Sequence, residues 1–164
     1  MEYFPLVDKN DNVIGKIGSD EHVTDYKQIR FANAILYKGN KIIVPKRTMT
    51  KKLYPGCYDY SGGGHVNYGE SYLEAIVREM KEELGIDISN ENIVEINTYI
   101  KEHYIQKVYY LKKDIDKKDI RTQEDEVEYV KWLSKEKINE LIENNQFRES
   151  NIEGYKCIIN NIKL

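Results

Sequence analysis

Apolar residues follow two different spacings along this chain, and each spacing predicts a different secondary structure. In residues 71–84 they recur every three or four positions, which predicts a helix with an apolar stripe of Leu73, Ile76, Val77, Met80 and Leu84. Gly85 follows where a helix C-cap is expected. Residues 48–64 predict a loop with one short strand near residues 58–60. Short apolar or alternating runs predict strands at residues 3–7, 12–18, 30–38, 41–47, 93–103, 106–113 and 127–133, and further helices near 135–144 and 150–162.

Polar turns join the first four predicted strands in pairs. Residues 8–11 read Asp-Lys-Asn-Asp, and Gly39-Asn40 stands between the next two strands, so both pairs are expected to form β-hairpins. The chain has no internal repeat and no segment that reads as a linker. Because a chain of 164 residues is usually one domain, we expect a single α/β domain over residues 1–164.

Composition narrows the class of protein and its compartment. The net charge of −3 provides no general attraction to nucleic acid or to an anionic membrane. No apolar run approaches the roughly 20 residues that span a bilayer, and the N-terminus lacks the features of a signal peptide. Two cysteines, Cys57 and Cys157, fit a reducing compartment. We therefore expect a cytoplasmic protein, and the oligomeric state is open, with a homodimer among the alternatives.

Three glutamates crowd one face of the predicted helix. Glu79, Glu82 and Glu83 stand at positions i, i+3 and i+4, which share a helix face. Like charges at this spacing repel one another unless a cation lies among them. The upstream run Ser61–Gly64 allows the backbone to approach a ligand closely. Together these features predict a site for a hard divalent metal ion and the phosphates that it would hold.

The spacing of residues 64–86 resembles the Nudix box, G-x5-E-x7-R-E-U-x-E-E-x-G-U, where U is a bulky aliphatic residue. A match of this length arises by chance with a probability on the order of 10⁻⁷ at average residue usage. Every defined position is occupied, by Gly64, Glu70, Arg78, Glu79, Met80, Glu82, Glu83, Gly85 and Ile86.

This resemblance to Nudix hydrolases implies a fold and an activity. The fold is an α/β/α sandwich with a mixed sheet, and residues 1–20 would add an N-terminal hairpin extension. The activity is hydrolysis, with Mg²⁺ or Mn²⁺, of the P–O–P bond of a nucleoside diphosphate linked to another moiety, or of a nucleoside di- or triphosphate. The substrate would therefore be a small nucleotide.

The resemblance also assigns roles within the box. Glu79 and Glu83, one helical turn apart, are the first-choice metal ligands, since Mg²⁺ prefers carboxylate oxygens and retains several waters. Glu82 would join when further ions bind, and the backbone carbonyl of Gly63 would complete the set. Glu70 and Arg78 would orient these glutamates through hydrogen bonds and ion pairs. Glu79, Glu82 and Arg78 are thus candidate catalytic residues.

A general base is expected outside the box, among Glu124, Asp125, Glu126 and Glu128. We favour Glu126 because its separation of six residues from Trp132 resembles that of family members whose outlying glutamate reaches the metals. Alternation along a strand places Glu126 and Glu128 on one face.

Two basic residues, Arg47 and Lys52, are candidates for binding the substrate phosphates. Arg47 ends a predicted strand that leads toward the glycine run, and Lys52 precedes the segment Tyr54-Pro55-Gly56.

Two alternatives accompany this interpretation. The chain also resembles the subgroup that includes type I isopentenyl diphosphate isomerase, and His65 matches a metal-ligand histidine of that enzyme. However, Gly63 stands where the isomerase carries its cysteine, Ile29 stands where another histidine is expected, and the box is complete. For His65 we expect hydrogen bonding to the loop backbone. The second alternative is a non-catalytic nucleotide- or RNA-binding Nudix domain.

Overall fold

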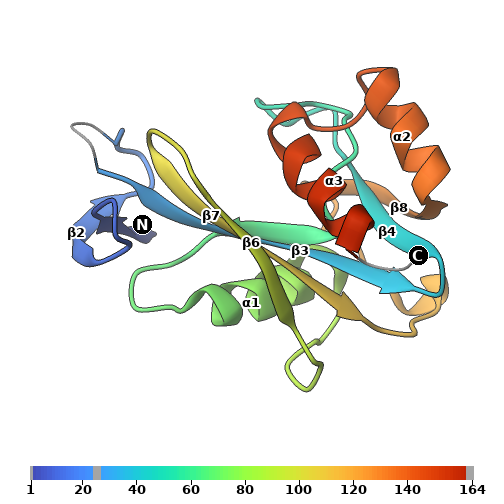
Figure 1. Ribbon diagram of the computed structural model, residues 1–164, viewed down its shortest axis with the longest axis horizontal. Coiled ribbons are helices and arrows are strands. Elements are labelled where there is room, and N and C mark those ends of the chain that lie inside the picture. The colour runs from blue at the N-terminus through green and yellow to red at the C-terminus, as the bar shows by residue number, and fades with distance from the viewer. Residues whose placement is uncertain (1, 24–26, 162–164) are drawn as a thin grey trace.

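The computed structural model describes residues 2–23 and 27–161, which form a mixed β-sheet with helices on both faces (Figure 1). A separate two-stranded hairpin lies beyond one end of this sheet. Residue 1 of the predicted extension and residue 162 of the last predicted helix lie outside the described residues. The predicted α/β fold with a mixed sheet and an N-terminal hairpin is confirmed. In chain order the elements are β1 (Tyr3–Val7), β2 (Val13–Gly18), β3 (Ile29–Lys38), β4 (Lys41–Arg47), β5 (Gly62–His65), α1 (Tyr72–Leu84), β6 (Val94–Ile100), β7 (Tyr104–Lys112), η1 (Lys117–Asp119), β8 (Val127–Ser134), α2 (Lys135–Glu143), η2 (Glu149–Asn151) and α3 (Ile152–Asn161).

In the main sheet, the neighbouring strands β3 and β4 separate from each other beyond their connecting turn. Its strands run in the order β6-β7-β3-β4-β8, with β3 parallel to β7, and β5 pairs with β3 beside this path. β3 and β4 pair only next to their connecting turn, and β5 pairs with the N-terminal half of β3. Ser61 lies between the diverging strands. Its hydroxyl accepts a 2.8 Å hydrogen bond from the N–H of Leu36 and donates a 2.7 Å bond to the carbonyl of Ile43.

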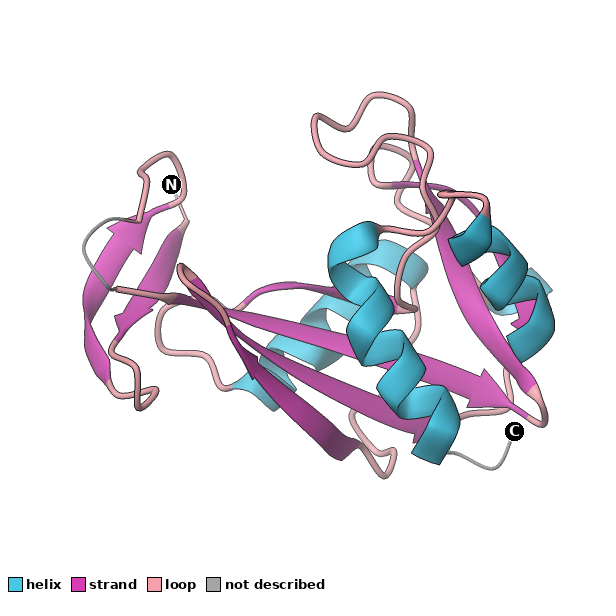
Figure 2. Ribbon diagram, turned by 45° about the horizontal axis from the view of Figure 1, so that its top comes forward, coloured by secondary structure: helices cyan, strands magenta, loops and turns pink. Residues whose placement is uncertain are grey.

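Helices lie on both faces of the sheet (Figure 2). Side-chain alternation along β3 distributes its residues between two cores, one on each face. Ala32, Ala34 and Leu36 pack in the core that includes α1. Ile35 packs in the core that includes α2 and α3. Asn33 shares the face of Ile35 by the same alternation, so β3 separates this polar residue from the helix α1.

Helix α1 has clear start and stop signals. Ser71 is its N-cap and forms a capping box with Glu74, and Gly85 ends it in the left-handed conformation at φ 68°. The predicted stripe is wrong at Leu73, whose residue is 47% exposed. Tyr72 and Ala75 face the sheet in the first turn instead, and they continue into the buried positions further along the helix.

The glycine run forms the strand β5, although the sequence predicts a loop there. Glycine has a low strand propensity, yet a side chain at any of these positions would collide with its surroundings. A Cβ on Gly62 would meet the Met80 sulfur, and one on Gly64 would meet the Glu79 carboxylate. The glycines therefore let α1 pack directly against the strand.

Two other predicted strand positions are corrected. The strand near residues 58–60 is reduced to isolated bridges from Tyr58 to Lys46 and to Phe147. β7 begins at Tyr104 because the N–H of Lys101 bonds to the Tyr104 carbonyl at 2.9 Å, which closes a tight turn before that strand.

Candidate active site

Arg78 lies at the centre of the acidic residues beside α1. Its guanidinium donates two hydrogen bonds to Glu70, at 2.9 and 3.0 Å. It also donates to Glu79 at 2.8 Å, to Glu82 at 3.1 Å and to the backbone carbonyl of His65 at 2.9 Å. Burial opposes its charge, but Glu70 and Glu79 outweigh burial and raise the pKa of Arg78 above its ordinary value. Arg78 is thus a cation fixed among three carboxylates.

The local sequence builds this cluster. Arg78, Glu79 and Glu82 project from neighbouring positions of α1, while Glu70 lies just before the helix. A tight turn fixes Glu70, because Asn67 and Glu70 exchange hydrogen bonds. The Asn67 N–H donates to the Glu70 carboxylate at 2.9 Å, and the Glu70 N–H donates to the Asn67 carbonyl at 2.9 Å.

Glu79 and Glu83 lie beside β5, where their charged forms are unfavourable. The Glu79 side chain is 14% exposed, and burial raises its pKa, which the Arg78 guanidinium offsets in part. Burial raises the pKa of Glu83 further, and the nearby Glu79 and Asp59 add to that increase. The N–H of Gly63, 3.4 Å from a Glu83 oxygen, opposes the increase. A cation placed against these two carboxyl groups would stabilise their charged forms.

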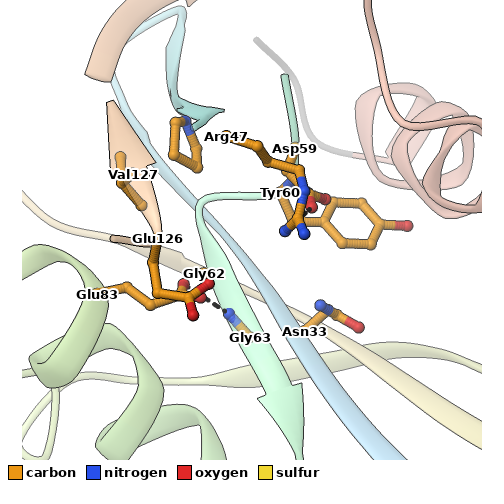
Figure 3. A pocket seen from close by; sticks show the side chains of 10 residues that line it. Asn33, Arg47, Asp59, Tyr60, Gly62, Gly63, Glu83, Glu126 and Val127 are labelled. Carbon is orange, nitrogen blue, oxygen red and sulfur yellow. Dashed lines mark hydrogen bonds and ion pairs between the residues drawn. The ribbon is translucent and has the colours of Figure 1, made fainter. Parts of the chain in front are cut away.

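The carboxylates of Glu126 and Glu83 lie close together beside Gly63 in a small pocket (Figure 3). The loop that carries Glu126 is attached to the end of α1, since the N–H of Gln123 donates to the Glu83 carbonyl at 2.9 Å. The Lys51 ammonium lies 2.6 Å from a Glu126 oxygen. Segments distant in sequence therefore converge on one acidic pocket.

A second charged centre surrounds Asp59, which is 8% exposed. Arg148 donates to its carboxylate at 3.1 Å, and the Arg47 guanidinium lies 3.6 Å away. The Asn151 amide and the N–H of Tyr60 donate to the other oxygen. Asp59 is thus an anion held by two arginines, the opposite of the arrangement around Arg78.

An open cleft of about 710 Å³ joins the two centres. Arg78 and Glu79 from the first centre and Arg47 and Arg148 from the second all line it. The cleft brings carboxylates that suit a cation next to basic groups that suit an anion such as a phosphate.

Comparison with known proteins identifies the family. A family model described as the NUDIX domain matches residues 27–153. The chain belongs to the Nudix family. A Nudix hydrolase of Deinococcus radiodurans is 36% identical to this Nudix protein over 88 residues, which are 53% of this chain and 52% of that protein. An isopentenyl-diphosphate Delta-isomerase 1 of Photorhabdus laumondii is 36% identical over 93 residues, which are 56% of this chain and 53% of that protein.

The chain thus spans about half the length of these curated relatives. The similarity in fold extends further. A crystal structure of a Deinococcus radiodurans protein superposes with a TM-score of 0.79 and 26% identity, and it covers 92% of this chain and 94% of that one.

The donor set of this Nudix protein fits a hard divalent cation. Within residues 2–23 and 27–161, no group of three His, Cys, Asp or Glu side chains is arranged as a metal site. Arg78 instead engages Glu79 and Glu82. Mg²⁺ requires only one or two protein carboxylates, because waters and substrate phosphates complete its coordination. The half-buried pair Glu79 and Glu83, next to the backbone of Gly63, meets that requirement.

Most of the sequence-predicted site residues line the cleft of this Nudix protein. Glu79, Glu82, Glu83, Arg78, Gly63, Arg47, Lys52 and Glu126 all do so, and Glu70 supports them through Arg78. The side chains of Glu128 and Glu126 do not point the same way, although strand alternation predicted one shared face. Glu128 pairs with Lys46 at 3.0 Å, because β8 begins at Val127 and its register with β4 shifts at that point.

Three residues of the site were missed by sequence reasoning. Lys51, and not its exposed neighbour Lys52, pairs with Glu126. Asp59 and Arg148 form the second centre, although 89 positions separate them. The adjacency of Lys51 to Lys52 was the one available signal, since Asp59 and Arg148 lie in no motif.

His65 contacts its surroundings differently from the expectation. Its backbone carbonyl accepts from Arg78, while its ring stacks on Phe4 at 4.3 Å and packs against Phe31 at 4.2 Å between centroids. Burial, together with the charges of Arg148 and Arg78, lowers the pKa of His65 to about 4. The N-terminal hairpin thus contributes Phe4 to the wall of the cleft.

Finally, the described part of the chain has no helix with the length and apolar character that crossing a bilayer requires.

Proposed function

We propose that this protein hydrolyses the P–O–P bond of a nucleoside diphosphate linked to another moiety, or of a nucleoside di- or triphosphate, with Mg²⁺ or Mn²⁺. On this proposal residues 1–164 act as one cytoplasmic domain, with residues 1–20 as an extension. The observation that carries it is the pair of half-buried carboxyl groups, Glu79 and Glu83, next to Glu126 in a cleft that arginines also line.

The residues divide the work of hydrolysing a diphosphate. Glu79 and Glu83 would hold the cation, with Glu82 and the Gly63 carbonyl as further ligands. Bound there, the cation would neutralise phosphoryl oxygens and lower the pKa of a bound water. Arg78 keeps Glu79 and Glu82 oriented through its hydrogen bonds.

Arg47 and Arg148 line the same cleft and suit the remaining phosphate oxygens. Their shared partner Asp59 holds both side chains in place before a substrate arrives. A diphosphate lying between the two centres would then meet the cation held by the carboxylates at one centre and the arginines at the other.

Glu126 is suited to accept the proton from the attacking water. Its carboxylate lies beside Glu83 in the small pocket and is engaged by Lys51 at 2.6 Å. A substrate phosphate would compete for the Lys51 ammonium and free Glu126 to take the proton. Lys51 would in this way exchange one anionic partner for another.

The test is a panel of nucleoside di- and triphosphates, nucleotide sugars, dinucleoside polyphosphates and NADH, assayed with Mg²⁺ and with Mn²⁺. Glu83→Gln should lower kcat at least about 100-fold on any substrate found, because it removes a charged ligand. Glu74→Gln is the matched control, since it lies on α1 and glutamine preserves its capping box. Full activity in a folded Glu83→Gln protein would overturn the proposal.

Isomerisation of isopentenyl diphosphate is the second candidate, because one relative carries that name. Against it, residue 63 admits only glycine: a Cβ there would collide with the Ala32 carbonyl and with Asn33. The cysteine that the isomerase resemblance requires at this position therefore has no room. Incubation with isopentenyl diphosphate in deuterated water would decide, and the absence of incorporated deuterium would exclude this activity.

A further inference from the structure

A second cavity, of about 210 Å³, opens next to the cleft. Asn33 faces it from β3 on the side of the sheet opposite α1, and Gln106 faces it from β7. Its lining consists of aromatic rings, side-chain amides, one arginine, one serine and glycine backbone, from Phe31, Tyr54, Tyr104, Asn33, Gln106, Asn151, Arg148, Ser150, Gly63 and Gly64. The composition differs sharply from that of the acidic pocket.

The cavity and the cleft are continuous. Phe31, Gly63, Gly64 and Arg148 line both. Gly64 of β5 lines both spaces and lies against the Glu79 carboxylate, and it carries no side chain that could divide them. A molecule whose diphosphate lies along the cleft could therefore place its organic substituent in the cavity.

The polar groups of the cavity are fixed in advance. The Gln106 amide donates to Asn33 at 2.7 Å and to Asn151 at 3.3 Å. These three side chains are 6%, 6% and 2% exposed, so their orientations are set by one another and not by solvent. Preorganised amides at a pocket wall give orientation and specificity to a ligand with its own donors and acceptors.

The rings supply flat apolar surface at the mouth. Phe31 and Tyr104 meet edge to face, with centroids 5.4 Å apart. The Arg148 guanidinium lies 5.2 Å from the centroid of the Tyr54 ring. Such surfaces stack on planar groups. An isoprenoid chain would cover the rings but leave the buried amides facing an apolar group, which is unfavourable.

We propose that this cavity binds the nucleobase of the substrate, with Phe31, Tyr104 and Gln106 as residues that determine specificity. The inference rests on the proposed function, because it assumes a diphosphate in the cleft. The volume supports a single base, since pockets for drug-sized ligands begin at about 300 Å³. The second half of a dinucleotide would lie outside.

The test measures binding without hydrolysis. We would titrate the protein, in Mg²⁺, with α,β-methylene-ADP, with α,β-methylene-UDP and with the base-free probe methylenediphosphonate. At least one nucleoside analogue should bind at least about 10-fold more tightly than methylenediphosphonate, the scale expected for stacking one base. Equal affinities in the wild-type protein would overturn the inference, whether or not any variant folds.

Two variants test whether the preference for nucleoside analogues arises in the cavity. Tyr104→Leu should reduce the preference for the nucleoside analogue to less than about 3-fold and leave methylenediphosphonate binding unchanged. Tyr110→Leu is the control, because Tyr110 is another half-buried ring of β7 that packs on Tyr37 at 6.2 Å, away from the cavity lining. Equal weakening of all probes by Tyr104→Leu would also contradict the inference.

The two proposals fail separately in these experiments. Suppose that the protein hydrolyses nothing in the panel but prefers nucleoside analogues, and that Tyr104→Leu abolishes this preference. The proposal that the cavity binds a nucleobase would then be supported, and the proposed hydrolysis would be contradicted. Hydrolysis of a panel substrate without a preference for nucleoside analogues would support the proposed function and contradict the nucleobase site.

Discussion

The two charged centres of the cleft have opposite charge arrangements, and they differ in how far apart in sequence their residues lie. Around Arg78, a cation is held by three carboxylates that stand within twelve residues of it or of one another. Around Asp59, an anion is held by Arg47, from the end of β4, and by Arg148, which is 89 positions away along the chain. The first centre is built on one helix and its preceding turn, whereas the second exists only after the chain has folded.

This difference bears on what each centre can do. The carboxylates around Arg78 can exchange one cation for another, so they suit a metal ion. The arginines around Asp59 can exchange one anion for another, so they suit a phosphate. If this comparison holds, each centre should respond to a different added ion when its central residue is neutralised.

The largest effect is expected for Arg78→Gln, which leaves Glu70, Glu79 and Glu82 facing one another. Without divalent ions the free energy of unfolding should fall by about 3 kcal/mol, the lower end of the scale for removing one partner of a buried ion pair, because the Arg78 side chain is 26% exposed. Mg²⁺ should restore part of that loss by neutralising the freed carboxylates. Urea unfolding with and without Mg²⁺ measures both.

Lys81→Gln is the control for Arg78→Gln, since it removes a charge from an exposed position of the same helix. It should change stability by less than about 0.5 kcal/mol. If Mg²⁺ stabilises neither the wild-type protein nor Arg78→Gln against urea, the carboxylates do not form a cation site.

Asp59→Asn should have a slightly smaller effect, about 2 kcal/mol, because asparagine preserves the shape and some hydrogen bonds. Arg47 and Arg148 would then repel one another at the cleft. Sulfate should restore stability by taking the place of the carboxylate, whereas Mg²⁺ should not. The exposed Asp87→Asn serves as control, and a sulfate response of the same size in that variant would show that the effect is general.

His65 senses both centres, because burial and the charges of Arg148 and Arg78 lower its pKa to about 4. In the unfolded chain its pKa is about 6.5. Acid therefore protonates the unfolded chain first, and the stability that neutral His65 provides above pH 6.5 is lost as the pH falls toward 4. Between pH 7.5 and 5 the loss is at most about 2 kcal/mol.

His65→Phe should remove this component of the pH dependence while keeping the stack with Phe4 and Phe31. Comparing the free energies of unfolding of the wild-type protein and of His65→Phe at pH 7.5 and at pH 5 separates the contribution of His65 from that of the titrating glutamates. The exposed His103→Gln provides the reference. An NMR titration can also compare the centres, since Arg148→Gln and Arg78→Gln should each raise the pKa of His65.

Sequence reasoning located the first centre and missed most of the second for a physical reason. Helix caps and the spacing of Arg78 and Glu79 are local, so periodicity and known turn chemistry reveal them. Asp59 and Arg148 meet through tertiary packing, which no local spacing encodes. The strand β5 was missed because glycine has low strand propensity, while the packing against α1 that demands glycine is a property of the fold.

The smallest effect is expected at Leu73, where periodicity predicted burial and the structure exposes the side chain. Leu73→Gln should change the free energy of unfolding by less than about 0.5 kcal/mol, whereas Ile76→Ala on the buried face should cost about 2–4 kcal/mol. Urea unfolding of both variants is the measurement. A loss of stability at Leu73 comparable to that at Ile76 would mean that substitutions anywhere on α1 destabilise the protein. A loss of stability in Arg78→Gln would then not by itself point to the charged centre. The responses of the Arg78 and Asp59 variants to Mg²⁺ and to sulfate would have to distinguish the two centres from general disruption of the helix.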